Sequence, residues 1–330
     1  MQSRKAPSQA PASAPSSFSK TLPVTPHPSL PYKGRFAPSP TGPLHFGSLV
    51  TALGSFLDAR THGGAWLLRM EDLDPPREQP GAADAILHAL EAFKLHWDGV
   101  VFYQSARLDA YRATAEQLLA DGLAYPCACS RREIADSGLR GLEGPVYPGT
   151  CRNGLSADRP ARAIRLRVPP DETFAFTDLL QGNIHQNLAS ELGDFVIRRA
   201  DGYFAYQLAV VLDDAFQSVT HVVRGADLLL STPRQIYLQR LLGLPTPIYM
   251  HLPVAINAAS EKLSKQTGAA ALDSSLPGTA LFDALRFLEQ NPPVKLRDAP
   301  PQELLNWAIS HWQAQRMQGL RTREITIESR

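Results

Sequence analysis

Short apolar segments alternate along the chain with longer segments that are apolar on one face. Residues Ala65–Met70 predict a buried strand, and residues 82–95 predict a helix because apolar side chains recur at helical spacing. Further helices are expected at about 46–61 and 106–120. Strands separated by helices indicate an α/β fold with a parallel sheet and right-handed crossovers, whose ligand crevice lies at the carboxyl ends of the strands.

The alternation continues in the second half of the chain. Residues 162–178 look like one strand, since Ile164, Leu166 and Val168 alternate with arginines. A hairpin is expected from Phe195 to Tyr206, because Asp201-Gly202 is a turn signal. The remaining expected elements are a helix at 207–216, a strand at 220–224, a helix at 232–242, an apolar run at 248–256, and helices near 281–288 and 301–312.

The stretch from Gly34 to Leu49 joins the first expected strand to the first expected helix. Its prolines stop regular pairing, and helical periodicity begins only after them. His45 and Gly47 therefore lie at the helix N-terminus, where unpaired N–H groups favour an anion and a missing Cβ admits a phosphate or a flat base. An ordinary loop with a capping or packed histidine explains these residues about equally well.

Three carboxylates, Glu71, Asp72 and Asp74, follow the second expected strand directly and so lie over the crevice. They could ligate a metal, cap the next helix or hold a substrate ammonium. The residues alone favour the cap, since two prolines come next.

Two other residues lie where strands end. Arg224 closes a strand and precedes a glycine, which places it over the crevice, although a salt bridge to the scaffold explains it almost as well. Tyr206 lies between a strand and a helix and is equally typical of a core aromatic side chain.

The segment that begins near Tyr125 breaks the alternation of strands and helices. Cys127 and Cys129 are separated by one residue, and Cys151 closes a loop rich in glycine and proline. Three soft ligands suggest tetrahedral zinc that needs a fourth donor. Three buried apolar cysteines are the alternative.

The composition limits the number of domains and the classes of protein to which this chain can belong. The 330 residues allow about two domains, and 44% hydrophobic residues suffice for a large core. No apolar run approaches the roughly 20 residues of a membrane span, and three cysteines suit a reducing compartment, so we expect a soluble, cytoplasmic protein with no membrane partner. The net charge of +1 does not exclude RNA, because clustering of basic residues matters more than their sum.

Two short motifs carry a resemblance to a known family. PLHFGS resembles the HIGH motif and KLSKQ resembles the KMSKS motif of class I aminoacyl-tRNA synthetases, and RFAPSPTGPLH and RMEDLDPPR resemble the glutamyl branch. The resemblance implies a Rossmann-like nucleotide-binding fold and activation of L-glutamate by ATP, with Mg²⁺ arriving with the ATP. The partners it implies are ATP, L-glutamate and RNA, not DNA.

The resemblance also assigns roles to residues at matching positions. The implied catalytic residues are His45 and Lys265. The implied ATP site contains His45, Gly47, Lys262 and Lys265. The implied L-glutamate pocket contains Arg35, Phe36, Ala37, Pro38, Ser39, Glu71, Tyr206 and Arg224. Arginine suits a side-chain carboxylate because its guanidinium is a planar, permanently charged fork.

A zinc site is implied in the same way. Relatives carry a C-x-C…Y-x-x-x-C site in which a tyrosine completes the coordination, and Tyr147 and Cys151 have that spacing. One structural zinc ion is therefore expected on Cys127, Cys129, Tyr147 and Cys151, in an inserted acceptor-type subdomain. The expected divisions are a disordered tail at 1–32, two catalytic halves at 33–122 and 193–266, the insert at 123–192, and a short helical segment at 267–330.

The group that accepts the activated glutamate is inferred from the length of the last segment. Residues 267–330 are too few for the anticodon-reading domain of a glutamyl-tRNA synthetase, and the combination resembles the glutamyl-Q tRNA(Asp) synthetases. That resemblance implies transfer of glutamate to the queuosine base in the anticodon of tRNA(Asp). Two alternatives stay open: a truncated glutamyl-tRNA synthetase that charges a 3′ end, and a non-catalytic RNA-binding paralogue.

Overall fold

The computed structural model describes residues 30–170, 172–257, 259–263, 272 and 275–325. Lys265 and nearly all of the expected N-terminal tail therefore lie outside the described residues. Tyr32, the last residue of that expected tail, is buried, and its hydroxyl donates to Asp58 over 2.6 Å.

A parallel sheet forms the centre of the molecule. It has two adjoining parts, a three-stranded sheet of β1 (Lys33–Phe36), β2 (Ala65–Met70) and β3 (Phe102–Tyr103), and a two-stranded sheet of β11 (His221–Gly225) and β12 (Ile248–Leu252). The pairs β1–β2, β2–β3 and β11–β12 are all parallel. β11 lies beside β1, where the backbone N–H of Thr220 donates to the carbonyl of Lys33 over 2.9 Å. The parallel sheet expected from the sequence is confirmed.

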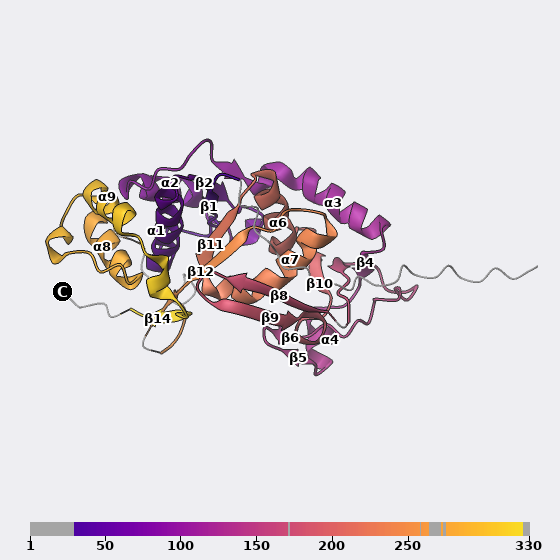
Figure 1. Cartoon of the computed structure of the whole chain (residues 1–330). Coiled ribbons are helices and arrows are strands. Elements are labelled where there is room, and N and C mark those ends of the chain that lie inside the picture. The colour runs from indigo at the N-terminus through magenta and orange to yellow at the C-terminus, as the bar shows by residue number, and fades with distance from the viewer. Residues whose placement is uncertain (1–29, 171, 258, 264–271, 273–274, 326–330) are drawn as a thin grey trace, which may run out of the picture.

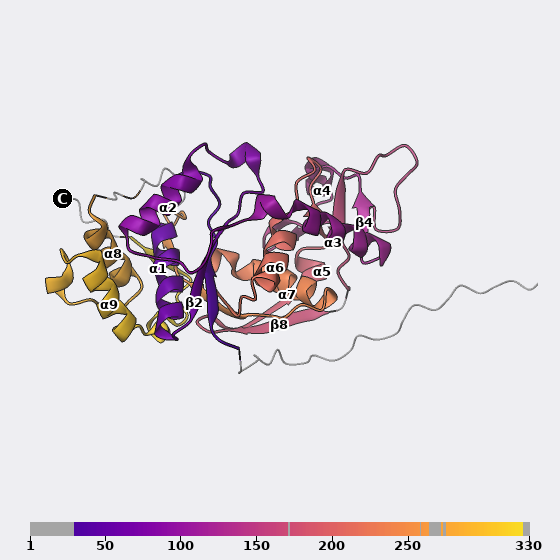
Figure 2. The same ribbon diagram turned by 90° about the horizontal axis from the view of Figure 1, so that it is seen from above.

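Helices cover this sheet and enclose the larger core. They are α1 (Phe46–Thr61), α2 (Ala82–Ala92), α8 (Pro277–Phe287) and α9 (Pro301–His311). The apolar faces of α1, α8 and α9 pack together, and the α8–α9 pair occupies one end of the molecule (Figures 1 and 2). The helix expected at 82–95 ends earlier because Lys94 adopts a left-handed backbone conformation, with φ of 58°.

A second core joins helices to an antiparallel sheet. The helices are α3 (Leu108–Ala120), α6 (Tyr206–Phe216) and α7 (Thr232–Leu241), and the strands are β4 (Ala124–Cys127), β7 (Ala163–Leu166) and β10 (Phe195–Arg198). The strand order is β10-β7-β4, so this sheet contains residues from both sides of the expected division at 192 and 193.

The prediction of one strand at 162–178 is wrong. β7 ends at Leu166, and β8 (Thr173–Asp178) pairs instead with β9 (Gly182–Asn187) in a separate antiparallel ribbon. Pro169 and Pro170 lie between the two strands and cannot donate to a ladder, which explains the break. The hairpin expected after β10 is present but short, with one bridge between Arg198 and Phe204.

Smaller elements complete the fold. These are α4 (Arg131–Asp136), α5 (Leu188–Glu191), β5 (Arg140–Gly141), β6 (Gly144–Pro145), β13 (Val254–Ile256) and β14 (Thr322–Glu324), with short 3₁₀ turns between them. The part containing β4 and α4 lies at the end of the molecule opposite α8 and α9 in both views (Figures 1 and 2). Among the described residues, no helix has the length and apolarity needed to cross a membrane.

Candidate active site

A cleft of about 660 Å³ opens at the carboxyl ends of β1, β2 and β11. This is where a parallel sheet places its ligand crevice. Every residue that the sequence assigned to L-glutamate or ATP lines this cleft except Lys265, which lies outside the described residues. The lining residues from that set are Arg35, Phe36, Ala37, Pro38, Ser39, His45, Gly47, Glu71, Tyr206, Arg224 and Lys262.

Arg224 is buried, at 3% exposed, and it makes contacts only with neutral groups in the described part of the chain. Its Nε donates to His251 Nε2 over 3.1 Å, and its Nη2 donates to the hydroxyl of Thr232 over 2.8 Å. Its Nη1 donates to the hydroxyl of Tyr206 over 3.3 Å. No carboxylate among the described residues forms an ion pair with Arg224, so the alternative explanation, a salt bridge to the scaffold, is not found there.

Arg35 is held differently. Its Nε donates to Asp214 Oδ1 over 3.1 Å, and Arg69 Nη2 donates to the same oxygen over 2.7 Å. All three groups are buried. Although burial alone would raise it, the two guanidinium groups hold the pKa of Asp214 below its usual value. Asp214 therefore stays ionised and fixes Arg35 at the floor of the cleft.

Glu71 lies beside this cluster, on the cleft wall. Its Oε1 is buried without a hydrogen-bond partner among the described residues and is 3.6 Å from Arg69 Nη2. Burial raises the pKa of Glu71 to about 7, against the opposing effect of Arg69 and Arg35. A buried carboxylate oxygen without a donor is unusual, since removing such a group from water without a partner is costly.

The pH dependence of substrate affinity tests whether Glu71 takes up a cation. The carboxylate loses its charge below a pKa of about 7, so affinity for an amino acid that places its ammonium there should be constant above that pH. Affinity should then fall by up to about tenfold per pH unit below it. We expect the KM for glutamate, measured by pyrophosphate exchange between about pH 5.5 and 8, to follow this course. Glu71→Gln should give a raised KM without this pH dependence, and an unchanged profile in that variant would contradict the assignment.

His45 is the N-cap of α1 and also lines the cleft. Its Nδ1 accepts from the backbone N–H of Ser48 over 3.3 Å, so a neutral ring carries its proton on Nε2 as a donor. The capping and functional interpretations of His45 are therefore compatible. A Cβ added at Gly47 would lie 3.2 Å from His45 Cε1, so glycine at this position lets the ring keep its place.

Lys262 lies at the rim of the cleft, where its Nζ is 2.5 Å from Asp227 Oδ2. β13 and the segment after it bring Lys262 there, because Leu263 N–H donates to the carbonyl of Ala255 over 2.8 Å.

The prediction that the acidic residues after β2 cap a helix is wrong for the described turn at Pro75–Arg77. Asp74 precedes this turn but makes no capping hydrogen bond, and pairs instead with Arg77 and Arg199. Asp72 accepts from the backbone and hydroxyl of Ser105 over 2.9 and 2.5 Å. These carboxylates therefore link the loop after β2 to neighbouring loops.

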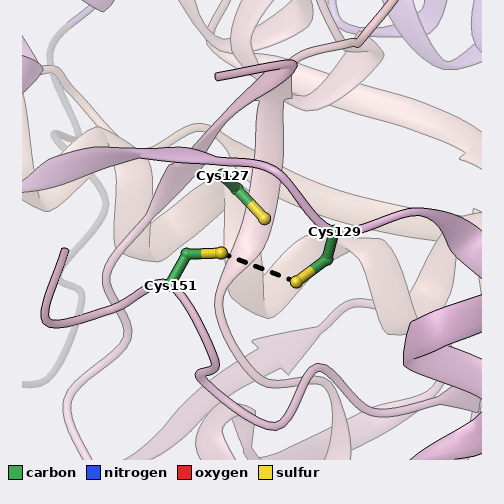
Figure 3. A group of neighbouring side chains, drawn as sticks. All are labelled: Cys127, Cys129 and Cys151. Atoms are coloured by element: carbon green, nitrogen blue, oxygen red, sulfur yellow. Dashed lines mark hydrogen bonds between the residues drawn. The ribbon is translucent and has the colours of Figure 1, made fainter. Parts of the chain in front are cut away.

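The three cysteines converge in the segment after β4 (Figure 3). Their sulfur atoms lie within 4.8 Å of one another, and Cys129 Sγ is 3.5 Å from Cys151 Sγ. The Tyr147 hydroxyl lies 3.5 Å from Cys127 Sγ and 3.9 Å from Cys129 Sγ. Zinc–sulfur bonds of about 2.3 Å in a tetrahedron place sulfur atoms about 3.8 Å apart, so the four donors fit zinc.

Four residues of the site were not identified from the sequence: Arg69, Asp214, Asp178 and His251. Signals were present for two of them. Arg69 is a charge inside an otherwise apolar strand, and Asp214 lies in the apolar helix α6 next to a second buried aspartate. Such a charge is buried only with a partner, which suggests an internal network. Asp178 and His251 come together through the pairing of distant segments, which no local pattern indicates.

Comparison with known proteins agrees with this geometry. Residues 32–277 match the family described as tRNA synthetases class I (E and Q), catalytic domain. A glutamyl-Q tRNA(Asp) synthetase of Aromatoleum aromaticum is 60% identical over 86% of this chain and 89% of its own length, and one of Dechloromonas aromatica is 60% identical over 86% and 94%.

A solved relative supports the fold. The crystal structure of glutamate-tRNA synthetase from Elizabethkingia anophelis aligns with a TM-score of 0.73 and 25% identity, over 91% of this chain and 69% of the other. The family match at residues 32–277 includes both the parallel strands and the segment with the cysteines. The chain belongs to the class I tRNA synthetase family, as a ligase-type enzyme of the glutamyl-Q tRNA(Asp) synthetase group.

Proposed function

We propose that this protein activates L-glutamate with ATP to give glutamyl-adenylate, and then transfers the glutamate to the queuosine base in the anticodon of tRNA(Asp). The observation that carries the first step is that two charged groups of the cleft lack specific partners among the described residues. Arg224 lacks a carboxylate among the described residues, and Glu71 Oε1 lacks a donor. An amino acid with an ammonium and a side-chain carboxylate supplies both missing partners.

The charge balance of the cleft supports an acidic amino acid. Among the charged side chains enclosed in and beneath the cleft, Arg35, Arg69 and Arg224 carry three positive charges, and Asp214 and an ionised Glu71 carry two negative charges. The more exposed charges at its rim pair with each other, Lys262 with Asp227 and Arg77 with Asp74. The difference is one positive charge, which the net negative charge of glutamate neutralises. Glutamine would leave a buried guanidinium charge without a counter-ion, which is unfavourable at low dielectric.

The activation step is an in-line displacement. An oxygen of the glutamate α-carboxylate forms a bond to the α-phosphorus of ATP, the bond from that phosphorus to the bridging oxygen breaks, and pyrophosphate leaves with the electron pair. His45 would donate from Nε2 to the phosphate oxygens, and Lys262 and Lys265 would hold the terminal phosphates. Bound Mg²⁺, arriving with ATP, would supply further neutralisation of the phosphate charge.

Support for the acceptor comes from the relatives. They carry the name glutamyl-Q tRNA(Asp) synthetase, and the chain covers most of their length. We therefore propose the queuosine-containing anticodon as acceptor, with both steps in the cytoplasm, where ATP and tRNA are available. Transfer proceeds by attack of an acceptor nucleophile on the adenylate carbonyl carbon, with AMP as leaving group.

The acceptor experiment uses the full chain with ATP, labelled glutamate and tRNA that contains or lacks queuosine. We expect label only on the modified tRNA, and we expect it to survive removal of the 3′ adenosine. Labelling that is abolished by removal of the 3′ adenosine would show a 3′-charging enzyme instead. Absence of glutamate-dependent pyrophosphate exchange would identify a non-catalytic relative.

We further propose that Cys127, Cys129, Cys151 and Tyr147 hold one structural zinc ion. Four protein donors leave no open position for a substrate, which is typical of structural sites. Arg165 lies against these donors, because its Nε donates to Cys127 Sγ over 3.3 Å and its guanidinium lies over the ring of Tyr147. Zinc would tie the end of β4 to the loop that contains Cys151.

Replacing Cys151 by serine tests the zinc site. Bound zinc, measured by elemental analysis of the purified chain, should fall from about one ion per chain to near zero, because one of four donors is lost. Thermal stability should fall, and transfer to tRNA should suffer more than pyrophosphate exchange, since none of the four donors lines the cleft. The matched control is Ser156→Ala on the same loop, which should retain the metal. Zinc content unchanged in Cys151→Ser would refute the site.

A further inference from the structure

The guanidinium of Arg224 is fixed by groups from three other elements. His251 belongs to β12, Thr232 begins α7 and Tyr206 begins α6. Two of the three nitrogen atoms of the guanidinium, Nε and Nη2, donate to fully buried partners, with His251 and Thr232 both at 0% exposed. These contacts restrict the orientation of the guanidinium plane of Arg224.

The contact with His251 determines which nitrogen of the ring carries the proton. An arginine Nε can only donate, so His251 Nε2 must accept and Nδ1 must carry the hydrogen. Nδ1 lies 2.6 Å from Asp178 Oδ2, so the ring donates to this carboxylate. Burial lowers the pKa of His251 to about 4, which keeps the ring neutral near pH 7, as acceptance at Nε2 requires.

Asp178 is itself firmly held at the turn between β8 and β9. Its Oδ1 accepts from the backbone N–H groups of Leu180, Gln181 and His251 over 3.0, 2.9 and 3.3 Å. Its side chain is fully buried. Although burial alone would raise it, the hydrogen bond from His251 and these backbone donors keep the pKa of Asp178 below its usual value. The result is a continuous chain of contacts from the β8–β9 turn to the cleft.

We propose that Asp178 and His251 are positioning residues, which orient Arg224 toward a substrate carboxylate and thereby set affinity and selectivity for an acidic amino acid. The inference rests on the proposed function, since it takes the ligand of Arg224 to be the side-chain carboxylate of glutamate.

The contrast with Arg35 explains why a histidine lies between Arg224 and Asp178. Asp214 contacts Arg35 directly, which fixes that side chain but also neutralises its charge. A carboxylate placed directly on Arg224 would do the same and would compete with the substrate. The imidazole transmits the fixed position of Asp178 to Arg224 while separating the two charges by the width of a ring. Arg224 is thus both rigid and available as a cation.

The test compares His251→Ala, His251→Gln and Asp178→Asn with the wild-type chain in pyrophosphate exchange, varying glutamate and ATP separately. We expect His251→Ala to raise the KM for glutamate by about tenfold or more with the KM for ATP changed less than about threefold. Glutamine at 251 can accept from Arg224 through its amide oxygen, so His251→Gln should restore much of the affinity. Asp178→Asn should shift the KM for glutamate in the same direction by a smaller factor. Preference for glutamate over glutamine should fall in parallel.

Ser55→Ala is the matched control, because it removes a buried hydrogen bond that Trp66 on β2 donates to Ser55 on α1, and neither residue lines the cleft. It should leave both KM values unchanged. Equal changes in the KM for glutamate and for ATP, or an unchanged KM for glutamate in all three variants, would overturn the inference. If His251→Ala does not fold, His251→Gln and Asp178→Asn decide the outcome by the same criteria. A wild-type chain without glutamate-dependent exchange would overturn the proposed function instead, so the two failures are distinguishable.

Discussion

Arg224→Ala is expected to abolish most glutamate-dependent pyrophosphate exchange. The buried guanidinium has no carboxylate partner among the described residues, so we expect the substrate to supply the matching charge. Losing a charged, desolvated contact of this kind costs about 2–5 kcal/mol of binding free energy. That range corresponds to a fall of about 30- to 5,000-fold in kcat/KM for glutamate. The measurement is exchange rate against glutamate concentration at saturating ATP.

Two further variants show whether the planar shape of the Arg224 guanidinium, as well as its charge, affects kcat/KM for glutamate. Arg224→Lys keeps the charge but cannot contact His251, Thr232 and a carboxylate simultaneously, so its kcat/KM should lie between alanine and wild type. Arg112→Ala, which removes an exposed arginine paired with Asp109, should behave as wild type. A kcat/KM for glutamate in Arg224→Ala within about threefold of wild type would exclude Arg224 from the substrate site.

The sequence predicted the location of the cleft because its main features are local. The proline-rich loop after β1 and the residues after β2 and β11 each lie within a few positions of a strand end, and parallel pairing brings those ends together. Arg35, Glu71 and Arg224 could therefore be placed in one site without knowledge of any contact. The motifs then suggested the ligand.

The partners of these residues could not be predicted, because they depend on contacts between distant segments. His251 follows Arg224 by 27 positions in the chain, and Asp178 precedes His251 by 73. The first contact depends on the register in which β11 pairs with β12. The second depends on how the β8–β9 ribbon packs against β12, and the sequence pattern wrongly merged β8 with β7. Periodicity reports which face of an element is buried, and it contains no information on which distant polar group will satisfy a buried charge.

Asp214→Asn is expected to reduce stability substantially. Asp214 is 5% exposed and accepts from both Arg35 and Arg69, which are 3% and 0% exposed. Asparagine has the same shape but no charge, and its amide NH₂ would face one of the two guanidinium groups. Removing one partner from a buried ionic cluster lowers the free energy of unfolding by about 3–5 kcal/mol. For a chain of this size, the melting temperature should fall by about 6–15 °C in thermal unfolding near pH 7.

The pH dependence of this loss separates electrostatics from packing. Asp214 has a lowered pKa in the folded protein, so its stabilising effect is complete above the pKa of the unfolded carboxyl group and disappears as the pH falls through the folded value. The stability gap between wild type and Asp214→Asn should therefore be constant near neutral pH and narrow in acid. Asp109→Asn is the matched control, because its carboxylate is exposed and its ion pair with Arg112 lies at the surface. A gap that persists unchanged in acid would mean that asparagine disturbs packing and that charge pairing does not hold Arg35 in the cleft.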